Sequence, residues 1–460
     1  MRRLRGGACI ATGMALLALG VPVGTAGADS PTGPHGTAKA RKAVVEPTGR
    51  LASPAAMRSG RLSCGDVITK NTTLTANIGP CAGNGIIIGA DNITLNLNGH
   101  TVAGTGSRAD GTGGIRLPNR KGVTVTGRPG SSGIRATVSG FAAGVVVNGG
   151  SGNTIENLNV RDNFGPDGYD DNFQPVALLG DGIVLFKSAS NQIINNVVSN
   201  NGAYDGIGIF GLGSNSNLIQ GNTVDANVGI PYIRNANGTG ILINHFYDQP
   251  IGTNETISGN SVIANTVRGN LWGSGITSVG NIGAQISDNV VEDNGNQLRP
   301  DATYETLAEE YPANGIGVRP GAGRFRVGTN MVITNNVVNN NGFNGIFLEG
   351  SFDNPAQNRV EGNQVFHNGA VGIWARNGES GSLIKNNTTG FNYILDLFDQ
   401  WGSYGYDCLN EWSGNTWGEV QPGAQEVPAL GHPYGAPFEN AYAPDCTTAG
   451  GSGPNPPAEG

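Results

Sequence analysis

Charged residues are scarce in this 460-residue chain: Asp, Glu, Lys and Arg make up 13% of it, about half of their usual share. Five histidines and five cysteines occur, and none of them cluster with the spacing of a zinc site. The formal net charge of −8 disfavours nucleic acid and anionic membranes as partners of the whole surface. The composition therefore argues against nucleic-acid-binding proteins and Cys/His metalloproteins.

A long apolar run that could span a membrane is also missing. The one apolar run, residues 14–23, follows a basic start at residues 2–5 and precedes Ala26-Gly27-Ala28. It is too short to cross a bilayer, and the three features together are typical of a secretory signal peptide. We therefore expect residues 1–28 to be cleaved near Ala28 and the protein to be secreted. Loss of three arginines and no acid changes the net charge from −8 to −11.

Four cysteines follow this signal: Cys64, Cys81, Cys408 and Cys446. An even number in an exported chain indicates disulfides. Three pairings can be drawn. Because the cysteines form two groups near the two ends of the chain, we expect Cys64–Cys81 and Cys408–Cys446.

What the chain has in abundance is glycine, 76 residues, and a repeat. GIVLFKSASNQIINNVVSNN and GIGIFGLGSNSNLIQGNTVDAN follow one another with an offset of 24 residues between Ile183 and Ile207. A period of this size predicts a repeat architecture. The glycine-apolar start of the unit recurs at Ile86, Ile115, Val145, Ile183, Ile207, Ile241, Ile276, Ile316, Ile346 and Ile373, with Ile394 as its last occurrence.

Asparagine recurs at fixed places within the unit. One predicted column is Asn196, Asn222, Asn260, Asn289, Asn336, Asn363 and Asn387, and another is Asn163, Asn201, Asn227, Asn265, Asn294, Asn341, Asn368 and Asn392. If each unit is one coil, equivalent residues stack about 4.8 Å apart, and stacked Asn amides bond to one another in ladders. The sequence therefore predicts an all-β, single-domain parallel β-helix of about ten to eleven coils, each buried against its neighbours.

The ends of such a stack expose unpaired strand edges that need covers. We expect a disordered leader at 29–62, the β-helix at 63–395, an aromatic, disulfide-closed C-terminal cap at 396–446 and a disordered tail at 447–460. The disulfide-closed segment 64–81 would cap the first end. We expect the protein to be a monomer.

Long insertions interrupt the units at only two joints, before and after the glycine-apolar strand. They are residues 164–177, 229–238, 245–254, 295–313 and 320–329. They should therefore crowd the two rims of one sheet, and loops on a rigid scaffold are where function is usually found.

A family resemblance supports this fold. The opening CGDVITKNTTLTANIGPCAGNGIIIGADNITLNLNGHTVAG and the closing ILDLFDQ and DCLNEWSGNTWG resemble the ends of secreted actinobacterial right-handed parallel β-helix proteins. The repeats resemble the pectate-lyase-like superfamily and NosD-like periplasmic repeats. Over residues 64–446 the resemblance implies a right-handed helix and, as activities, polysaccharide lyase, hydrolase or epimerase, or none. The Asp-Pro-His segment of alginate epimerases and the arginine motifs of pectate lyases are absent, so no catalytic residues carry over.

One candidate site follows from the outward positions after each glycine-apolar start. Arg319, Glu349 and Arg376 should stack in consecutive coils beside Phe347 and Trp374. Aromatic rings and charged groups are what a sugar surface needs, for ring stacking and for hydroxyls or carboxylates. A surface ladder of ion pairs is the structural alternative.

A second candidate site precedes the same strand. Asp181 and Asp205 should be neighbours at one coil spacing, as in a retaining glycosidase pair or an oxygen-ligand Ca²⁺ site. Their column continues as Thr239, Ser274, Asn314 and Asn344. All of these side chains can bond to backbone in turns, which is the structural alternative. Apart from this calcium, no cofactor is expected.

These residues support several functions. A lyase acting on an extracellular polysaccharide would use Arg319 or Arg376 against a uronate carboxylate, with His245 or Tyr247 as base. A glycoside hydrolase would use the two aspartates, or Glu349 with one of them. The alternative is a non-catalytic β-helix that binds a glycan or cell-surface polymer, or a purely structural protein. His245 could also be an ordinary solvated loop residue.

Overall fold

The computed structural model describes residues 62–106, 112–128, 135–165, 180–229, 238–244, 257–271, 273–295, 313–319, 328–350, 355–376, 378–393, 395–399 and 410–418. All of them belong to one compact unit, Ala56–Gly460. The signal peptide, almost all of the leader and the tail predicted from the sequence lie outside the described residues. No helix long and apolar enough to cross a membrane occurs in these segments.

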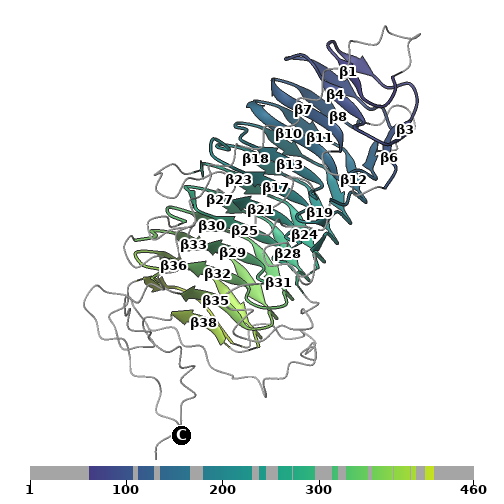
Figure 1. Ribbon diagram of the computed structural model, residues 1–460. Coiled ribbons are helices and arrows are strands. Elements are labelled where there is room, and N and C mark those ends of the chain that lie inside the picture. Colours follow the sequence, from purple (N-terminus) through teal and green to yellow (C-terminus); the bar gives the residue numbers. More distant parts are fainter. Residues whose placement is uncertain are drawn as a thin grey trace, which may run out of the picture. The chain divides into compact units, whose positions relative to one another are not determined.

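The described unit is a parallel β-helix with three long sheets, as the repeat predicted (Figure 1). Sheet A is the twelve-stranded sheet of β1 (Asp66–Ile68), β4 (Ile86–Ile88), β7 (Gly113–Lys121), β10 (Ala143–Ser151), β13 (Ile183–Phe186), β17 (Ile207–Phe210), β21 (Ile241–Asn244), β25 (Ile276–Val279), β29 (Ile316–Arg319), β32 (Ile346–Glu349), β35 (Val371–Arg376) and β38 (Leu395–Asp399). Each coil contributes one strand to it, and every neighbouring pair is parallel.

The other two sheets follow sheet A in each coil. Sheet B contains β2 (Thr72–Thr73), β5 (Thr94–Asn96), β8 (Thr124–Thr126), β11 (Thr154–Glu156), β14 (Gln192–Ile194), β18 (Leu218–Gln220), β23 (Ser261–Ile263), β27 (Gln285–Ser287), β30 (Val332–Thr334), β33 (Arg359–Glu361), β36 (Leu383–Lys385) and β39 (Glu411–Ser413). Sheet C contains β3 (Ile78–Cys81), β6 (Thr101–Gly104), β9 (Thr137–Ser139), β12 (Asn159–Arg161), β15 (Val197–Ser199), β19 (Thr223–Asp225), β24 (Thr266–Arg268), β28 (Val290–Glu292), β31 (Val337–Asn339), β34 (Gln364–Phe366) and β37 (Thr388–Gly390). Two short pairs, β16 (Gly202–Ala203) with β20 (Val228–Gly229) and β22 (Ile257–Ser258) with β26 (Asn281–Ile282), complete the described strands.

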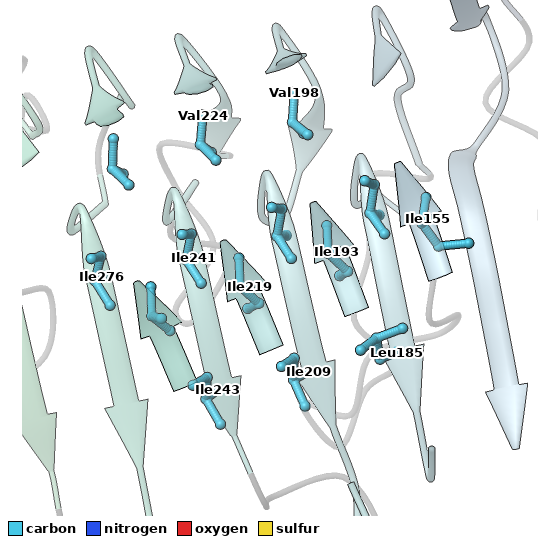
Figure 2. Packing of buried hydrophobic residues seen from close by; sticks show 14 of the residues in the cluster. Ile155, Leu185, Ile193, Val198, Ile209, Ile219, Val224, Ile241, Ile243 and Ile276 are labelled. Atoms are coloured by element: carbon cyan, nitrogen blue, oxygen red, sulfur yellow. The ribbon is translucent and has the colours of Figure 1, made fainter. Parts of the chain in front are cut away.

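The apolar starts of the units form the interior. Ile183 pairs with Ile207, and Ile207 with Ile241, and all three are fully buried. Figure 2 shows Ile241 and Ile243, with Ile219 and Val224 from the other two sheets, pointing into the space between the sheets. At the last coil the partner of Ile373 is Leu397; Ile394, predicted for this place, lies outside the described residues.

Three asparagine ladders run along the corners, and one of their coils differs from the prediction. Asn222 bonds to Asn265 rather than to Asn260, and Asn227 bonds to Asn270 rather than to Asn265. Asn260 belongs to a third ladder, in which it accepts from Asn217. The coil carries three asparagines at five-residue intervals, so a shift by one corner preserves the sequence pattern. Strand pairing of β18 with β23 fixes the true register.

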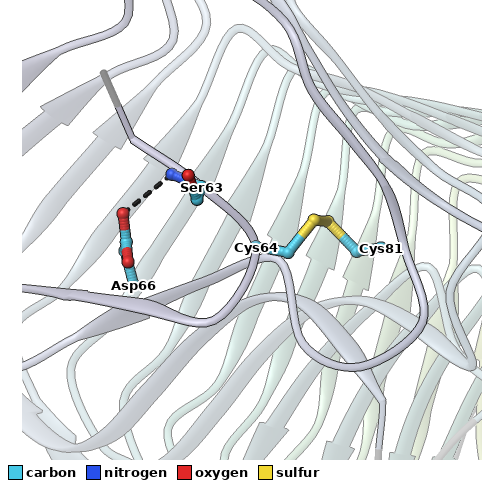
Figure 3. The surroundings of a disulfide bond; sticks show 4 residues. All are labelled: Ser63, Cys64, Asp66 and Cys81. Carbon is cyan, nitrogen blue, oxygen red and sulfur yellow. Dashed lines mark hydrogen bonds between the residues drawn. A yellow bond between two sulfur atoms is a disulfide. The ribbon is translucent and has the colours of Figure 1, made fainter. Parts of the chain in front are cut away.

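The first end of the stack carries the predicted Cys64–Cys81 disulfide, shown in Figure 3. Cys408 and Cys446 lie outside the described residues, so their pairing stays a prediction. At the other end, β38 and β39 continue sheets A and B past residue 395, where the cap was expected to begin.

Candidate functional site

The outer face of sheet A brings the predicted site residues together. Along each of its strands the inward side chains belong to the continuous core, whereas outward ones form two separate clusters. The first cluster includes Val184 and Phe210, with Phe186 and Leu242 packed against it. The second includes Phe343, Phe347, Ala370, Val371 and Trp374, with Leu395 and Phe398 packed against it. Between them the outward positions are the small or polar Thr277 and Gly317.

Asp181 and Asp205 stack in adjacent coils, each two residues before a sheet A strand, because Ile183 and Ile207 are register partners. Both side chains are only 2% exposed. Burial, and then the negative charge of Asp205, raise the pKa of Asp181 well above its ordinary value. Burial raises the pKa of Asp205 to about 8, against the opposing effect of hydrogen bonds from Thr239. The pair therefore holds a proton at neutral pH.

Side chains of this column also bond to the backbone, which is the structural alternative for these residues. Asp205 Oδ1 accepts a hydrogen bond from the backbone N–H of Thr239 at 3.1 Å. Two positions further along the column from Asp205, Ser274 Oγ accepts from the N–H of Asn314 at 3.2 Å. Each side chain thus ties its own coil to the next. Asp181 Oδ1 is buried and has no well-aligned hydrogen-bond partner among the described residues, although the backbone N–H groups of Asp205 and of Asp181 itself act to lower the pKa of this carboxyl group.

Arg319, Glu349 and Arg376 come together at the ends of β29, β32 and β35. Arg319 Nε lies 3.7 Å from Glu349 Oε2, an ion-pair distance that is too long for a hydrogen bond. Glu349 and Arg376 are register partners. Burial lowers the pKa of the Arg319 guanidinium, and Glu349 partly offsets this shift while the positive charge of Arg376 adds to it. The three charged side chains therefore lie together, as the sequence predicted. Their role in binding or catalysis stays a prediction.

The aromatic rings beside these charges lie differently from the open surface that the sequence predicted. Phe347 and Trp374 are register partners, but only 1% and 6% exposed. Their rings meet edge to face, with centroids 5.4 Å apart, and Trp374 also packs on Phe398. The Cζ atoms of Arg319 and Arg376 lie 5.7 Å and 5.3 Å from the ring centroids of Phe347 and Trp374, within cation–π range.

Several buried polar atoms of this face have no hydrogen-bond partner among the residues that the structure describes. They are Asp181 Oδ1, Asn314 Nδ2, Arg319 Nε and Nη2, and Trp374 Nε1. Asn314 Nδ2 would lie 3.4 Å from a Cβ atom built on Gly317. The ring of Trp374 packs against the ring of Phe347. Buried polar groups are almost always paired in folded proteins, so four unpaired side chains along one face indicate a site for a polar ligand.

Sequence reasoning missed a second pair of buried carboxyl groups, Glu379 and Asp399. Asp399 Oδ2 accepts from Trp412 Nε1 at 2.9 Å and from Asn410 Nδ2 at 3.0 Å. Glu379 is fully buried, and burial raises its pKa to about 7. The sequence contains a signal for Asp399. Inward and outward side chains alternate along β38, and Asp399 follows the inward Leu397 by two residues, so its side chain should also point inward. The segment was interpreted as a cap, and the alternation was not followed into it.

The remaining predicted residues give no further site. His245 and Tyr247 lie outside the described residues. The described residues do not offer calcium a ligand set: Asp181 and Asp205 are joined by no third acidic group, no cluster of three or more His, Cys, Asp or Glu side chains is found among them, and Ca²⁺ requires six to eight oxygen ligands.

Several solved structures show a distant likeness to this chain. The periplasmic alginate epimerase AlgG has a TM-score of 0.44 at 12% identity, over 78% of this chain and 77% of that one. The A-module of the Azotobacter vinelandii mannuronan C-5 epimerase AlgE6 has a TM-score of 0.40 at 15% identity, over 78% and 89%. The Dettilon tailspike protein has 0.38 at 15%, over 77% and 61%. No curated protein matches the chain.

At these identities and TM-scores we base no conclusion on the likeness. The family evidence is stronger. The family described as "Right handed beta helix region" matches residues 62–232 and 121–323, which together span more than half of the chain. Its expected architecture is the one that the three parallel sheets display. This chain therefore belongs to the right-handed beta helix region family.

Proposed function

We propose that this is an exported protein that holds an acidic extracellular polysaccharide across the outer face of sheet A and cleaves it there. Export agrees with the Cys64–Cys81 disulfide, since such bonds persist in oxidising compartments. Sheet A supplies a rigid, regular surface along the stack, which suits an extended polymer better than a compact small molecule.

The observation that carries the proposal is the set of unpaired buried donors. Within the described part of the chain, Arg319 Nε and Nη2, Trp374 Nε1 and Asn314 Nδ2 have no acceptor, and a buried donor without an acceptor costs about 1–3 kcal/mol. A ligand rich in acceptor oxygens would relieve this cost. Sugar hydroxyls suit the indole and amide donors, and a uronate carboxylate suits the guanidinium.

The charges favour an anionic sugar over a neutral one. This cluster places two guanidinium groups, those of Arg319 and Arg376, beside the carboxylate of Glu349, and a guanidinium matches a uronate carboxylate in charge and geometry. Partial burial strengthens such electrostatic interactions relative to bulk water. The aromatic rings of Phe347 and Trp374 hold both guanidinium groups in place, so a bound carboxylate meets preorganised donors.

A non-catalytic glycan-binding β-helix is the second candidate. The ion pair between Glu349 and Arg319 favours it, because a contact between neighbouring coils gives this carboxylate a structural role without catalysis.

The test is a panel of polyuronates and neutral polysaccharides, incubated with the wild-type protein and with Glu349→Gln. Binding is measured by affinity electrophoresis, and cleavage by reducing ends and by the ultraviolet absorbance of unsaturated uronates. We expect polyuronates to bind and to be cleaved. Binding without any cleavage would support the non-catalytic alternative, and equal binding of neutral polymers, or no binding at all, would refute the proposal.

A further inference from the structure

We propose that the interior of the β-helix contains a buried water-binding site, at the corner between sheets A and B that Ser278 and Asn281 share. Ser278 lies in β25, and Asn281 is the first residue of β26, just past the bend. The site lies inside the stack, whereas Arg319 and its neighbours lie on the outer face of sheet A. The inference therefore does not depend on the proposed function.

Both side chains point into the interior. Ser278 is the register partner of Ile243 and of Val318 in the neighbouring coils. Asn281 is the register partner of Ile257. These three partners belong to the continuous core, and Ser278 and Asn281 are themselves 0% exposed. Two polar side chains thus occupy positions that neighbouring coils fill with aliphatic ones.

The polar atoms of this corner have no hydrogen-bond partner among the residues that the structure describes. They are Ser278 Oγ, Asn281 Oδ1 and Asn281 Nδ2, so the asparagine has neither an acceptor for its Nδ2 nor a donor for its Oδ1. The ladder residue Asn222 differs, because its Oδ1 and Nδ2 are both bonded. Buried polar groups are almost always paired with protein or with ordered water. A partner from outside the chain is therefore expected here.

The asparagine ladder beside this corner is interrupted. In the third ladder, Asn260 Oδ1 accepts from the backbone N–H and from Nδ2 of Asn217. The next position of that column is Ala284, and alanine has no side-chain oxygen. The ladder thus stops three residues after Asn281, so it cannot supply the partners that this corner needs.

The side chains at this corner also become smaller from one coil to the next. The preceding coil places Ile243 and Ile257 there. The following coil places Val318 there, with Gly328 in the register of Asn281. Val318 covers this glycine, since a Cβ atom built on Gly328 would lie 2.6 Å from Val318 Cγ1. Because the strand spacing is constant, the smaller side chains leave room for a molecule of the size of water but none for a sugar.

The chemistry of the polar atoms selects the ligand. A cation would pair with Asn281 Oδ1 and Ser278 Oγ but would leave the Nδ2 donors unpaired, and an anion would leave Oδ1 unpaired. Water both donates and accepts, and a buried water typically makes about three hydrogen bonds. Water is therefore the ligand that can satisfy all three atoms.

The first test is a high-resolution crystal structure of the full chain, with a second data set from crystals soaked in rubidium chloride. We expect density for ordered water within hydrogen-bonding distance of Asn281 and Ser278, and no anomalous rubidium signal there. A rubidium peak would assign the site to a cation and overturn the proposal. Density in which both side chains bond directly to protein groups, without water, would overturn it too.

The second test is water relaxation dispersion in solution, on wild type and on the double variant Ser278→Ile with Asn281→Ile, which copies the preceding coil. We expect the variant to lose the contribution of at least one long-lived internal water and to keep its unfolding temperature, since apolar groups replace the polar pair and its water together. The control Gln220→Ile, at an exposed position of sheet B, should retain that contribution. Unchanged dispersion in the double variant would contradict the proposal, and if this variant does not fold, the wild-type density decides.

Discussion

Asn222 Nδ2 donates a hydrogen bond to Asn265 Oδ1 at 3.0 Å, and the backbone N–H of Asn222 donates to the same oxygen at 2.8 Å. Asn222 Oδ1 in turn accepts both equivalent bonds from Asn196 in the preceding coil. One buried side chain therefore satisfies groups in two neighbouring coils. This relationship repeats along the stack and holds its corners together.

Replacing this side chain tests the ladder. Asn222→Ala would leave the backbone N–H of Asn196 unpaired and remove one of the two acceptors of Asn196 Nδ2, which also donates to Ile155 O, and each unpaired buried group costs about 1–3 kcal/mol. We expect the free energy of unfolding to fall by about 3 kcal/mol, measured by urea denaturation. Gln220→Ala, on the exposed side of the same coil, should change it by less than about 0.5 kcal/mol. Equal losses in the two variants would contradict the account.

Much of this architecture could be predicted from the sequence, because the apolar starts and the asparagines recur once in every coil. The repeat could not identify the correct corner in the coil with Asn260, Asn265 and Asn270. All three corners use the same residue at the same spacing, so only strand pairing separates them. Likewise, alternation predicted that Phe347 and Trp374 point outward, but it could not predict that their rings would be buried.

The buried Glu379 should make stability depend on pH. Burial raises its pKa from 4.5 to about 7 in the folded protein, with opposing hydrogen bonds from Ser382 and Asn358 and a further rise from Asp399. The folded state therefore binds more protons than the unfolded chain between these values. The contribution of Glu379 to the free energy of unfolding should fall by roughly 3 kcal/mol as pH rises from about 4.5 to 7, in addition to the pH dependence that the raised pKa values of Asp181 and Asp205 supply.

Glu379→Gln removes this titration. We expect the variant to lose the contribution of Glu379 to the pH dependence and to be more stable than wild type at pH 8, in urea titrations repeated across the range. Glu411→Gln, at an exposed position of β39, serves as the matched control and should behave as wild type. A variant that is less stable than wild type at pH 8 would mean that the folded state needs the ionised carboxylate.

The indole nitrogen of Trp374 is predicted to donate to the ligand. Trp374→Phe keeps an aromatic ring for Phe347, Phe398 and Arg376 but removes the unpaired Nε1 donor. We expect stability to stay within about 1 kcal/mol and polyuronate affinity to fall several-fold, since a hydrogen bond contributes about 1 kcal/mol. Trp417→Phe, at an exposed ring, should leave affinity unchanged. An unaltered affinity in Trp374→Phe would remove this residue from the site.

The candidate site was only partly predictable. The repeat predicted that Arg319, Glu349 and Arg376 lie together, because equivalent residues of neighbouring coils must stack. It could not reveal which donors would lack acceptors, since that depends on side-chain geometry rather than on periodicity. Glu379 belongs to no column, and nothing in its local sequence marks it as buried.

The most direct test of the central claim is the affinity of Arg319→Gln for a polyuronate, measured by isothermal titration calorimetry at two salt concentrations. The control is Arg359→Gln, whose guanidinium pairs with Glu361 on the exposed side of sheet B. Loss of a charge-assisted bond of about 1.5–3 kcal/mol should weaken binding by about 10-fold or more, and should reduce its salt dependence. The control should match wild type. Equal affinities of Arg319→Gln and wild type at both salt concentrations would contradict the claim that this face binds an acidic polysaccharide.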